Sequence, residues 1–354
     1  MQYVIEFIGA LALLIVVHEL GHFLACRLFK VPVEEFGVGL PPKALTLFRA
    51  GGTEFTLNWI PLGGFVRPRG ENDPKIFNGL AAAKPAVRIG VALAGPLANI
   101  LMVALLYAIS IALIGEPDPA RLDQVEVQAV LPGSPAEIAG LKAGDLLLAL
   151  NHQQIHSSDE ALTIIYANLD RPILVRYQRG KSVTEVSLTP LSSRSPNEGA
   201  VGVQLGPPMR PVSLLNAAWG GIEAAYLHSV FFVETLGKMA TNQAPAPGGI
   251  VGPIGMGRWY VGMREASPPQ GLIPLLDVLG FLINVSFSLA FFNFLPIPAL
   301  DGGRIVLALP ELIFRRRLKP GLENWLITFT FLLLLGLLVF VSLRDVFFPI
   351  EVLP

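Results

Sequence analysis

The sequence of 354 residues is poor in charged side chains and in cysteine. Only 15% of its residues are charged, whereas 52% are hydrophobic. A soluble domain carries about a quarter charged residues, so this composition indicates an integral membrane protein. The single cysteine, Cys26, excludes an intrachain disulfide framework and a cysteine-based zinc finger. The net charge of −1 argues against a nucleic acid as partner, because a nucleic-acid-binding protein presents a basic face.

Long apolar runs account for most of the hydrophobic residues. A helix needs roughly 17–25 apolar residues to cross a bilayer. Four transmembrane helices are expected, at residues 1–30, 89–114, 272–314 and 322–345. The first run lacks a basic n-region and continues past signal-peptide length, so we expect it to be retained.

The distribution of lysine and arginine predicts an orientation. Nine of them lie from Arg27 to Arg88, at the end of the first span and in the loop before the second, and the Arg315–Lys319 cluster follows the third. The positive-inside rule then puts residues 31–88 and this cluster in the cytoplasm, and both termini outside. Residues 212–241 are apolar but carry four ionisable side chains, and a fifth span there would invert everything downstream. We therefore expect an amphipathic segment on the outer face.

Residues 125–205 predict a folded insert on the outer side. Strand-like runs with β-branched alternation flank a helix signal, "SSDEALTIIYANL" (157–169). Between them, "LPGSPAEIAGLKAGDLLLALNHQQI" (131–155) resembles part of a PDZ domain of the bacterial protease type, although another small α/β insert is the alternative. PDZ domains bind extended peptides or chain ends by adding a strand to a sheet edge.

The loop at residues 31–88 also carries strand signals. Strand-like runs alternate there with Gly-Gly and Gly-Leu-Pro turns. This pattern predicts two to four strands in hairpins, close to the membrane surface.

The first span contains His18-Glu19-Leu20-Gly21-His22, an HExxH pattern. Residues i and i+4 share one face of a helix, so both imidazoles can reach one metal ion. Glu19 lies on the adjoining flank, where it can take a proton from water. Taken alone, the pattern leaves structural or pH-sensing histidines open.

A catalytic zinc ion with tetrahedral geometry needs a third protein ligand. The nearest downstream carboxylates, Glu34 and Glu35, follow Pro32 at the start of a loop. The distant candidate is Asp301 in "NFLPIPALDGG" (293–303), where two prolines break the third span; a helix broken at membrane depth lines a cavity. HExxH and Asp301 reach comparable depth in the membrane only if the region between the second and third spans crosses the bilayer an even number of times. The model of four spans satisfies this condition.

These motifs together resemble the site-2 protease family of intramembrane zinc metalloproteases. The resemblance rests on HExxH, "GPLANI" (95–100), the PDZ-like insert and "NFLPIPALDGG", and it runs over essentially the whole chain. The bacterial regulator-of-sigma-E type is most similar, although some of its members carry two PDZ domains and this chain has room for one. The expected fold is an α-helical polytopic membrane protein of four transmembrane helices, with a membrane-associated β-hairpin region and an inserted α/β PDZ domain.

The resemblance implies roles for individual residues. It implies that Zn²⁺ is the cofactor and that Glu19 is the general base, with the metal ligands being His18, His22 and Asp301.

The same resemblance extends beyond the metal site. Asn293 and Pro296 would help to hold the substrate backbone, and "FGVG" (36–39) and "PLGGFV" (61–66) look like the family's membrane-associated β elements. Asn99 would support the site or contact substrate, and a plain interhelical hydrogen bond is equally open.

The implied function is hydrolysis of peptide bonds within transmembrane segments at the bacterial inner membrane. Expected partners are single-span membrane proteins of the anti-sigma-factor kind, cut first by a site-1 type protease, and the lipid bilayer. Two other classes stay open. A metal transporter or sensor explains the histidines but not Glu19, and a PDZ-bearing scaffold with an inactive HExxH explains the insert but not Asp301.

Overall fold

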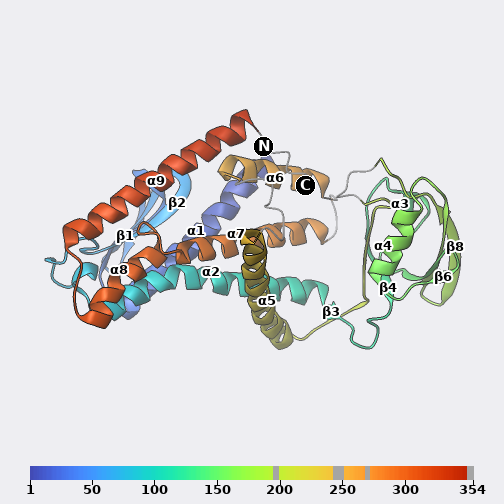
Figure 1. The fold of residues 1–354 in the computed structure, drawn as a ribbon, viewed down its shortest axis with the longest axis horizontal. Helices are drawn as coiled ribbons and strands as arrows, with labels where there is room; N and C mark the ends of the chain where they lie inside the picture. Colours follow the sequence, from blue (N-terminus) through green and yellow to red (C-terminus); the bar gives the residue numbers. More distant parts are fainter. Residues whose placement is uncertain (194–198, 242–250, 268–271, 349–354) are drawn as a thin grey trace. The chain divides into compact units, whose positions relative to one another are not determined.

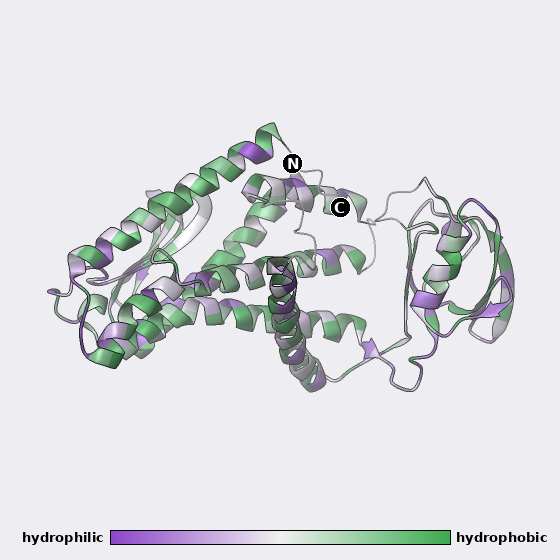
Figure 2. Ribbon diagram, viewed as in Figure 1, coloured by the Kyte–Doolittle hydropathy of each residue, from purple (hydrophilic) through white to green (hydrophobic). Residues whose placement is uncertain are grey.

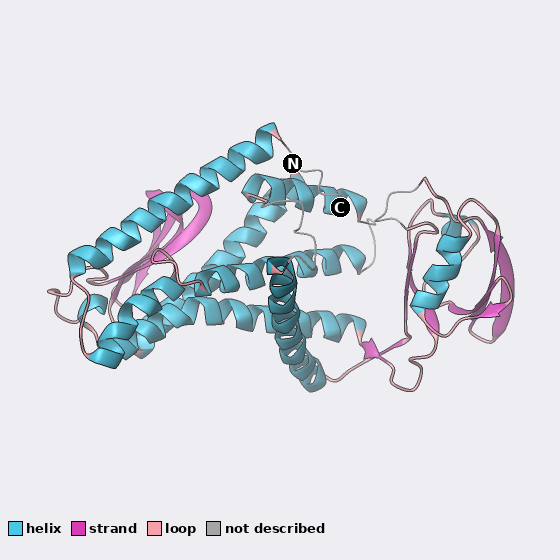
Figure 3. Ribbon diagram, viewed as in Figure 1, coloured by secondary structure: helices cyan, strands magenta, loops and turns pink. Residues whose placement is uncertain are grey.

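A computed structural model describes residues 1–193, 199–241, 251–267 and 272–348 (Figure 1). The chain forms two compact units, which we describe separately. The first combines residues 1–108, 220–266 and 275–352, and the second is built mainly from residues 109–219. Figure 3 shows that the first unit is mostly helical and that the second carries a sheet.

Four helices of the described chain are long and apolar enough to cross a membrane, the number that the sequence predicted. They are α1 (Gln2–Leu28), α2 (Pro85–Ile114), α7 (Ile273–Phe294) and α9 (Pro320–Phe347). Figure 2 shows that apolar residues predominate along them. Helix α2 begins four residues before the predicted residue 89, inside the region assigned to the loop, because Pro85 suits the first turn of a helix.

The predicted third span, residues 272–314, is broken at the two prolines, as the sequence indicated. Helix α7 ends at Phe294, and α8 (Asp301–Phe314) begins after a turn that contains Pro296 and Pro298. A proline lacks the backbone N–H that a continuous helix requires, which explains the break. The chain then packs closely on itself, since a Cβ on Gly302 would lie 2.2 Å from the carbonyl oxygen of Phe294.

Partly buried ion pairs join the elements at one end of the first unit. Arg88, in the first turn of α2, pairs with Glu311 of α8 at 2.9 Å and with Glu323 of α9 at 2.6 Å. Arg317 donates to the carbonyl oxygen of Ala81 in the short helix η1 (Leu80–Ala82). We call these residues the Arg88 layer.

The opposite end of this unit holds α6 (Pro253–Ala266), a helix that the sequence analysis did not predict. Its Arg264 pairs with Glu6 of α1 at 3.2 Å. Asp345 near the end of α9 accepts hydrogen bonds from the backbone N–H groups of Gly252 and Gly255, each at 2.9 Å. We call these residues the Glu6 layer. The two layers show that α1 runs antiparallel to α9, whose first turn lies beside that of α2.

Strands β1 (Val33–Ala50) and β2 (Thr53–Pro68) pair in a hairpin, within the predicted two to four strands. The two long strands also fold back on themselves, since Phe36 pairs with both Val66 and Phe55. The inner end of the hairpin packs on α1, where Phe23 makes edge contacts with Phe36 and Phe55. Arg27 of α1 also donates to Thr53 at 3.1 Å. The hairpin is therefore anchored to the helix that carries HExxH.

Helix α5 (Leu214–Ala240) covers the predicted amphipathic segment, and it is not among the candidate spans. His228 contacts Tyr107 of α2 at 2.8 Å, and Phe232 packs on Phe287 of α7. A Cβ on Gly221 would lie 2.4 Å from the carbonyl oxygen of Ala104. Helix α5 therefore packs on α2 and α7, and its outer-face position stays a prediction.

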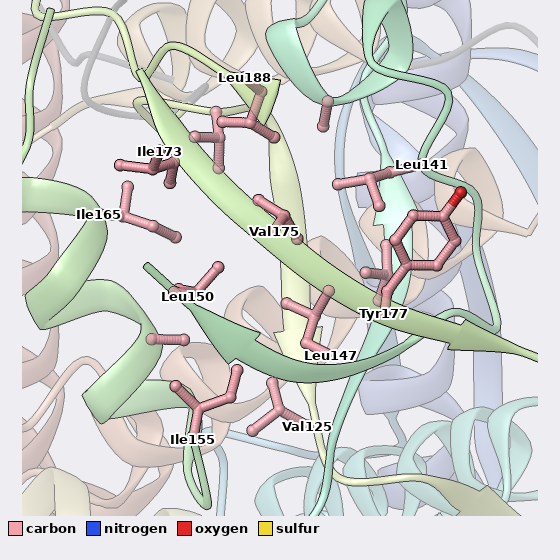
Figure 4. Close-up of a cluster of buried hydrophobic side chains, with 14 of the residues drawn as sticks. Val125, Leu141, Leu147, Leu150, Ile155, Ile165, Ile173, Val175, Tyr177 and Leu188 are labelled. Carbon is pink, nitrogen blue, oxygen red and sulfur yellow. The ribbon is translucent and has the colours of Figure 1, made fainter. Parts of the chain in front are cut away.

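The second unit contains a sheet with the strand order β8-β7-β5-β4-β9, and every pairing is antiparallel. Its buried side chains gather on one side of the strands, against α4 (Figure 4). Buried Asp145 (1% exposed) accepts two hydrogen bonds from Arg179, each at 2.6 Å. The elements are β4 (Val125–Val130), α3 (Pro135–Ile138), β5 (Leu146–Leu150), β6 (Gln153–Gln154), α4 (Ser158–Ala167), β7 (Ile173–Arg179), β8 (Ser182–Leu188) and β9 (Val203–Gly206), with the pair β3 (Glu116–Pro117) and β10 (Met209–Arg210) beside them.

Candidate active site

The fold brings Asp301 next to His18 and His22, although Asp301 follows His18 by 283 residues in the sequence. The His18 and His22 Nε2 atoms are 3.2 Å apart, and the Asp301 Oδ2 atom lies 3.2 Å from the first and 3.3 Å from the second. His18 and Asp301 are buried, and the Asp301 Oδ2 atom has no hydrogen-bond donor among the described residues. Three lone-pair-bearing atoms thus face a common point.

This triangle fits a tetrahedral metal ion. Ligand atoms at the 2.0–2.1 Å bond lengths of zinc lie roughly 3.3–3.4 Å from one another in a tetrahedron. The observed separations of 3.2–3.3 Å match that spacing. Two imidazoles and one carboxylate leave the fourth position to water, which is the donor set of catalytic zinc.

A close crossing of α1 and α2 makes room for the imidazoles. A Cβ on Gly95 would lie 2.3 Å from the Nε2 atom of His22 and 2.8 Å from the Cε1 atom of His18. A Cβ on Gly21 would lie 2.3 Å from the carbonyl oxygen of Ala94. Glycine at both positions therefore lets the two backbones approach while the rings occupy the space between them.

Hydrogen bonds fix the orientation of His22. Its Nδ1 atom lies 2.8 Å from the carbonyl oxygen of Val91 in α2. A carbonyl oxygen only accepts hydrogen bonds, so this contact requires the proton on Nδ1 and leaves the Nε2 lone pair free to bind a metal.

Asn99 performs the same task for His18. The Asn99 side chain is fully buried, and its amide lies 3.4 Å from the Nδ1 atom of His18. With the amide nitrogen on that side, the Oδ1 atom of Asn99 has no partner. Turning the amide by 180° lets Oδ1 accept the Nδ1–H proton, which removes the unpaired atom and frees Nε2. This position supports a ligand, one of the three readings that the sequence left open.

Glu19 lies where strand β2 crosses α1. A Cβ on Gly64 would lie 3.2 Å from the Cγ atom of Glu19, so the strand runs directly over this side chain. Glu19 shares a cavity of about 400 Å³ with His18, His22 and Asp301. The other residues that line the cavity are Phe65, Val66, Arg67, Pro68, Glu71, Asn72, Leu80, Arg88, Val91, Ala92, Asn293, Ala299, Arg304, Glu323 and Ile327.

The two residues predicted to hold substrate are placed differently. Asn293 lines the cavity, and its side chain donates to the carbonyl oxygen of Leu289 at 3.0 Å. Pro296 is exposed in the turn between α7 and α8, outside the set of described residues that line the cavity. Asn293 is therefore placed where a substrate in the cavity could contact it. Pro296 instead forms part of the turn that leads to Asp301.

Sequence reasoning missed Val91, Gly95, Glu71 and Arg304 as parts of this site. Gly95 belongs to the "GPLANI" stretch that carries the family resemblance, so its position close to the HExxH helix could have been predicted. Val91 contributes only a backbone carbonyl, which no residue pattern marks. Arg304 pairs with Glu71 at 2.7 Å across 233 positions of sequence.

Comparison with known proteins agrees with this geometry. The sequence profile of Peptidase family M50 matches residues 6–337. A Clostridium perfringens protein with the provisional name of a zinc metalloprotease is 32% identical over 99% of this chain and 100% of its own length. The metalloprotease MmpA of Caulobacter vibrioides is 27% identical over 96% of this chain and 94% of its own.

Two solved structures resemble a part of the chain. They are PDZ domains of SdrC-like proteins from Listeria monocytogenes and Listeria innocua, 23% and 26% identical to this chain. Each covers 23% of this chain, and the matches take in 87% and 93% of those structures, with TM-scores of 0.21.

The fold and the site define a metallopeptidase of the membrane: two histidines and an aspartate could hold a metal ion, in a chain with four helices long and apolar enough to cross a bilayer. The chain belongs to Peptidase family M50, the site-2 protease family. It is a membrane zinc metalloprotease.

Proposed function

We propose that this protease cuts the transmembrane segments of single-span membrane proteins, with zinc held by His18, His22 and Asp301. The observation that carries the proposal is the triangle of 3.2–3.3 Å between their ligand atoms, in a cavity that Glu19 shares. A transporter does not need a carboxylate between its two histidines, and an inactive scaffold does not need three converging ligands.

The residues around the cavity perform separate tasks. A bound zinc ion polarises the scissile carbonyl and makes water a better nucleophile. Glu19 takes the proton from the attacking water and gives it to the leaving amine. Val91 and Asn99 hold the imidazoles in the tautomer that binds metal.

The hairpin of β1 and β2 gives an unwound substrate a place to pair. A transmembrane helix shields its peptide bonds with its own hydrogen bonds, so the substrate has to unwind before cleavage. Strand β2 passes over Glu19, and its residues Phe65, Val66, Arg67 and Pro68 line the cavity. Backbone pairing with this hairpin replaces the hydrogen bonds that unwinding breaks.

The proposal also specifies the membrane, the substrates and the orientation of the enzyme. The enzyme acts in the inner membrane of a bacterium, on anti-sigma-factor-like proteins already shortened by a site-1 type protease. Residues 31–88 and the Arg315–Lys319 loop face the cytoplasm, and the termini and residues 125–205 face outside. The positive-inside rule supports this orientation. Cysteine labelling in a Cys26→Ser background tests it, and outer labelling at residues 31–88 contradicts it.

A Glu19→Gln variant tests the chemistry. The amide keeps the size of the side chain but cannot take a proton, so cleavage of a single-span substrate should fall by roughly 10²–10⁴-fold. Zinc content should stay at one ion per chain. Unchanged cleavage would reject Glu19 as the base, and absence of cleavage by the unmodified enzyme would reject the proposed activity.

The inserted domain selects substrates and supplies none of the residues around the metal, which all come from the first unit. As a PDZ domain it blocks bulky outer domains or captures a new chain end. Replacing residues 125–205 by a flexible linker should preserve cleavage of a trimmed substrate and increase cleavage of an untrimmed one. A folded, zinc-loaded deletion variant that cuts neither substrate would show that the domain belongs to the catalytic assembly.

A further inference from the structure

Arg304 is a cationic side chain of the cavity that the reaction described so far does not use. It follows Asp301 by three residues on α8, so the two side chains lie on the same face of the helix, one turn apart. The start of α8 is fixed by the tight packing of Gly303, whose Cβ would lie 2.0 Å from the carbonyl oxygen of Ile297. Arg304 is thus held at a set position beside a metal ligand.

The three arginines that line the cavity differ in how fully they are engaged. Arg88 is 11% exposed and uses both terminal nitrogens in ion pairs with Glu311 and Glu323. Arg67 stacks on the ring of Phe65 at 5.4 Å and pairs with a glutamate of β1.

Among the described residues, the one recorded acceptor of Arg304 is Glu71, so most of its donors are available to another partner. Its Nη1 atom donates to Glu71 at 2.7 Å, and the side chain is 40% exposed although it lines the cavity. A guanidinium carries five N–H donors and stays charged at every accessible pH. Its exposed surface therefore presents a permanent positive charge to whatever enters beside the metal ligands.

Peptide hydrolysis creates a negative charge in the same place. When the water oxygen bonds to the carbonyl carbon, the carbonyl electron pair moves onto its oxygen and the water proton passes to Glu19. When the C–N bond breaks, that pair returns and the nitrogen takes the proton. A donor that faces the oxygen in the intermediate step lowers the barrier, because it is engaged most strongly in the transition state.

We propose that the guanidinium of Arg304 donates a hydrogen bond to the scissile carbonyl oxygen and stabilises the charge that this oxygen gains. The inference rests on the proposed function and adds a catalytic residue to it. Glu71 orients the guanidinium through Nη1 and leaves its remaining N–H groups available to substrate. Glu71 is thus a positioning residue.

Steady-state cleavage of a single-span substrate by the purified full chain tests this role. Arg304→Gln should lower kcat by roughly 10²–10³-fold, as removal of one oxyanion donor does elsewhere, with KM changed only a few-fold and zinc content unchanged. Glu71→Gln breaks the same ion pair but keeps the guanidinium, so its kcat should fall only a few-fold. Added guanidinium ion should restore part of the activity of Arg304→Ala.

The outcomes separate a catalytic from a structural role. Equal losses in Arg304→Gln and Glu71→Gln would show that the ion pair alone matters, and they would overturn the inference. Loss of zinc in Arg304→Gln, or wild-type kcat in that variant, would overturn it as well. After any of these three outcomes, the proposed function would still hold if the unmodified enzyme cleaves the substrate and Glu19→Gln does not.

Discussion

Replacing Gly95 by alanine should remove zinc from the enzyme without unfolding it. The new Cβ would lie 2.3 Å from the Nε2 atom of His22, whereas ordinary van der Waals contact begins at 3.4 Å. The imidazole or α2 must therefore move by about 1 Å, and metal ligands tolerate about 0.2 Å. Because misdirecting a metal ligand costs 10–100-fold in affinity, we expect zinc affinity to fall by about 100-fold or more.

The same substitution favours the helix itself. Alanine stabilises a helix interior by about 1 kcal/mol relative to glycine. A loss of zinc would therefore not result from a lower helix propensity of α2. Gly9→Ala is the matched control, since it places a methyl group on α1 with no heavy atom within 4 Å. Helix content of both variants, measured by circular dichroism, should equal that of the unmodified chain.

Competition with a zinc chelator of known affinity measures the effect. Gly95→Ala should release its zinc at a chelator concentration about 100-fold lower than the parent and Gly9→Ala, and it should lose cleavage in parallel. A Gly95→Ala protein that keeps one zinc ion at the parent's chelator midpoint would refute the reasoning, because the imidazole would then have adjusted at no cost.

Three further outcomes follow from the described contacts. Asn99→Leu should weaken zinc binding by roughly 10–100-fold, as chelator competition would show, because the Nδ1–H group of His18 loses its acceptor. Asp301→Ala should leave less than one zinc ion per chain by elemental analysis, and wild-type content would reject this ligand. Arg179→Met should destabilise the second unit, because it leaves the buried Asp145 carboxylate without its ion-pair partner. Limited proteolysis of residues 125–206 measures that loss, and unchanged resistance would contradict it.

The sequence predicted the parts of this molecule that depend on local pattern. The four apolar helices follow from length and hydropathy, and HExxH follows from the spacing of residues on one helix face. Asp301 was identified because prolines in an apolar run imply a broken helix.

Other features depend on contacts between distant segments, which a single sequence does not reveal. Helix α6 is short and carries Arg258 and Arg264, so it lacks an apolar pattern, yet its Tyr260 is buried against Phe7 and Phe281. The packing of α5 on α2 is also a long-range contact that its ionisable residues do not reveal. His228 in fact has a hydrogen-bond partner in Tyr107.

Charged residues near the two ends of α1 define the depth of the site along this helix. Glu6 and Arg27 bracket α1 over roughly 32 Å at 1.5 Å per residue, close to the thickness of the hydrocarbon core. Glu19 lies 13 residues from Glu6, or roughly 20 Å beneath the Glu6 layer. A substrate helix aligned with α1 therefore meets the cavity at a fixed depth. On the proposed function, we expect the cleavage position to depend on its distance from one membrane face, so that lengthening the substrate's apolar run beyond that face moves the cut by as many residues as are added.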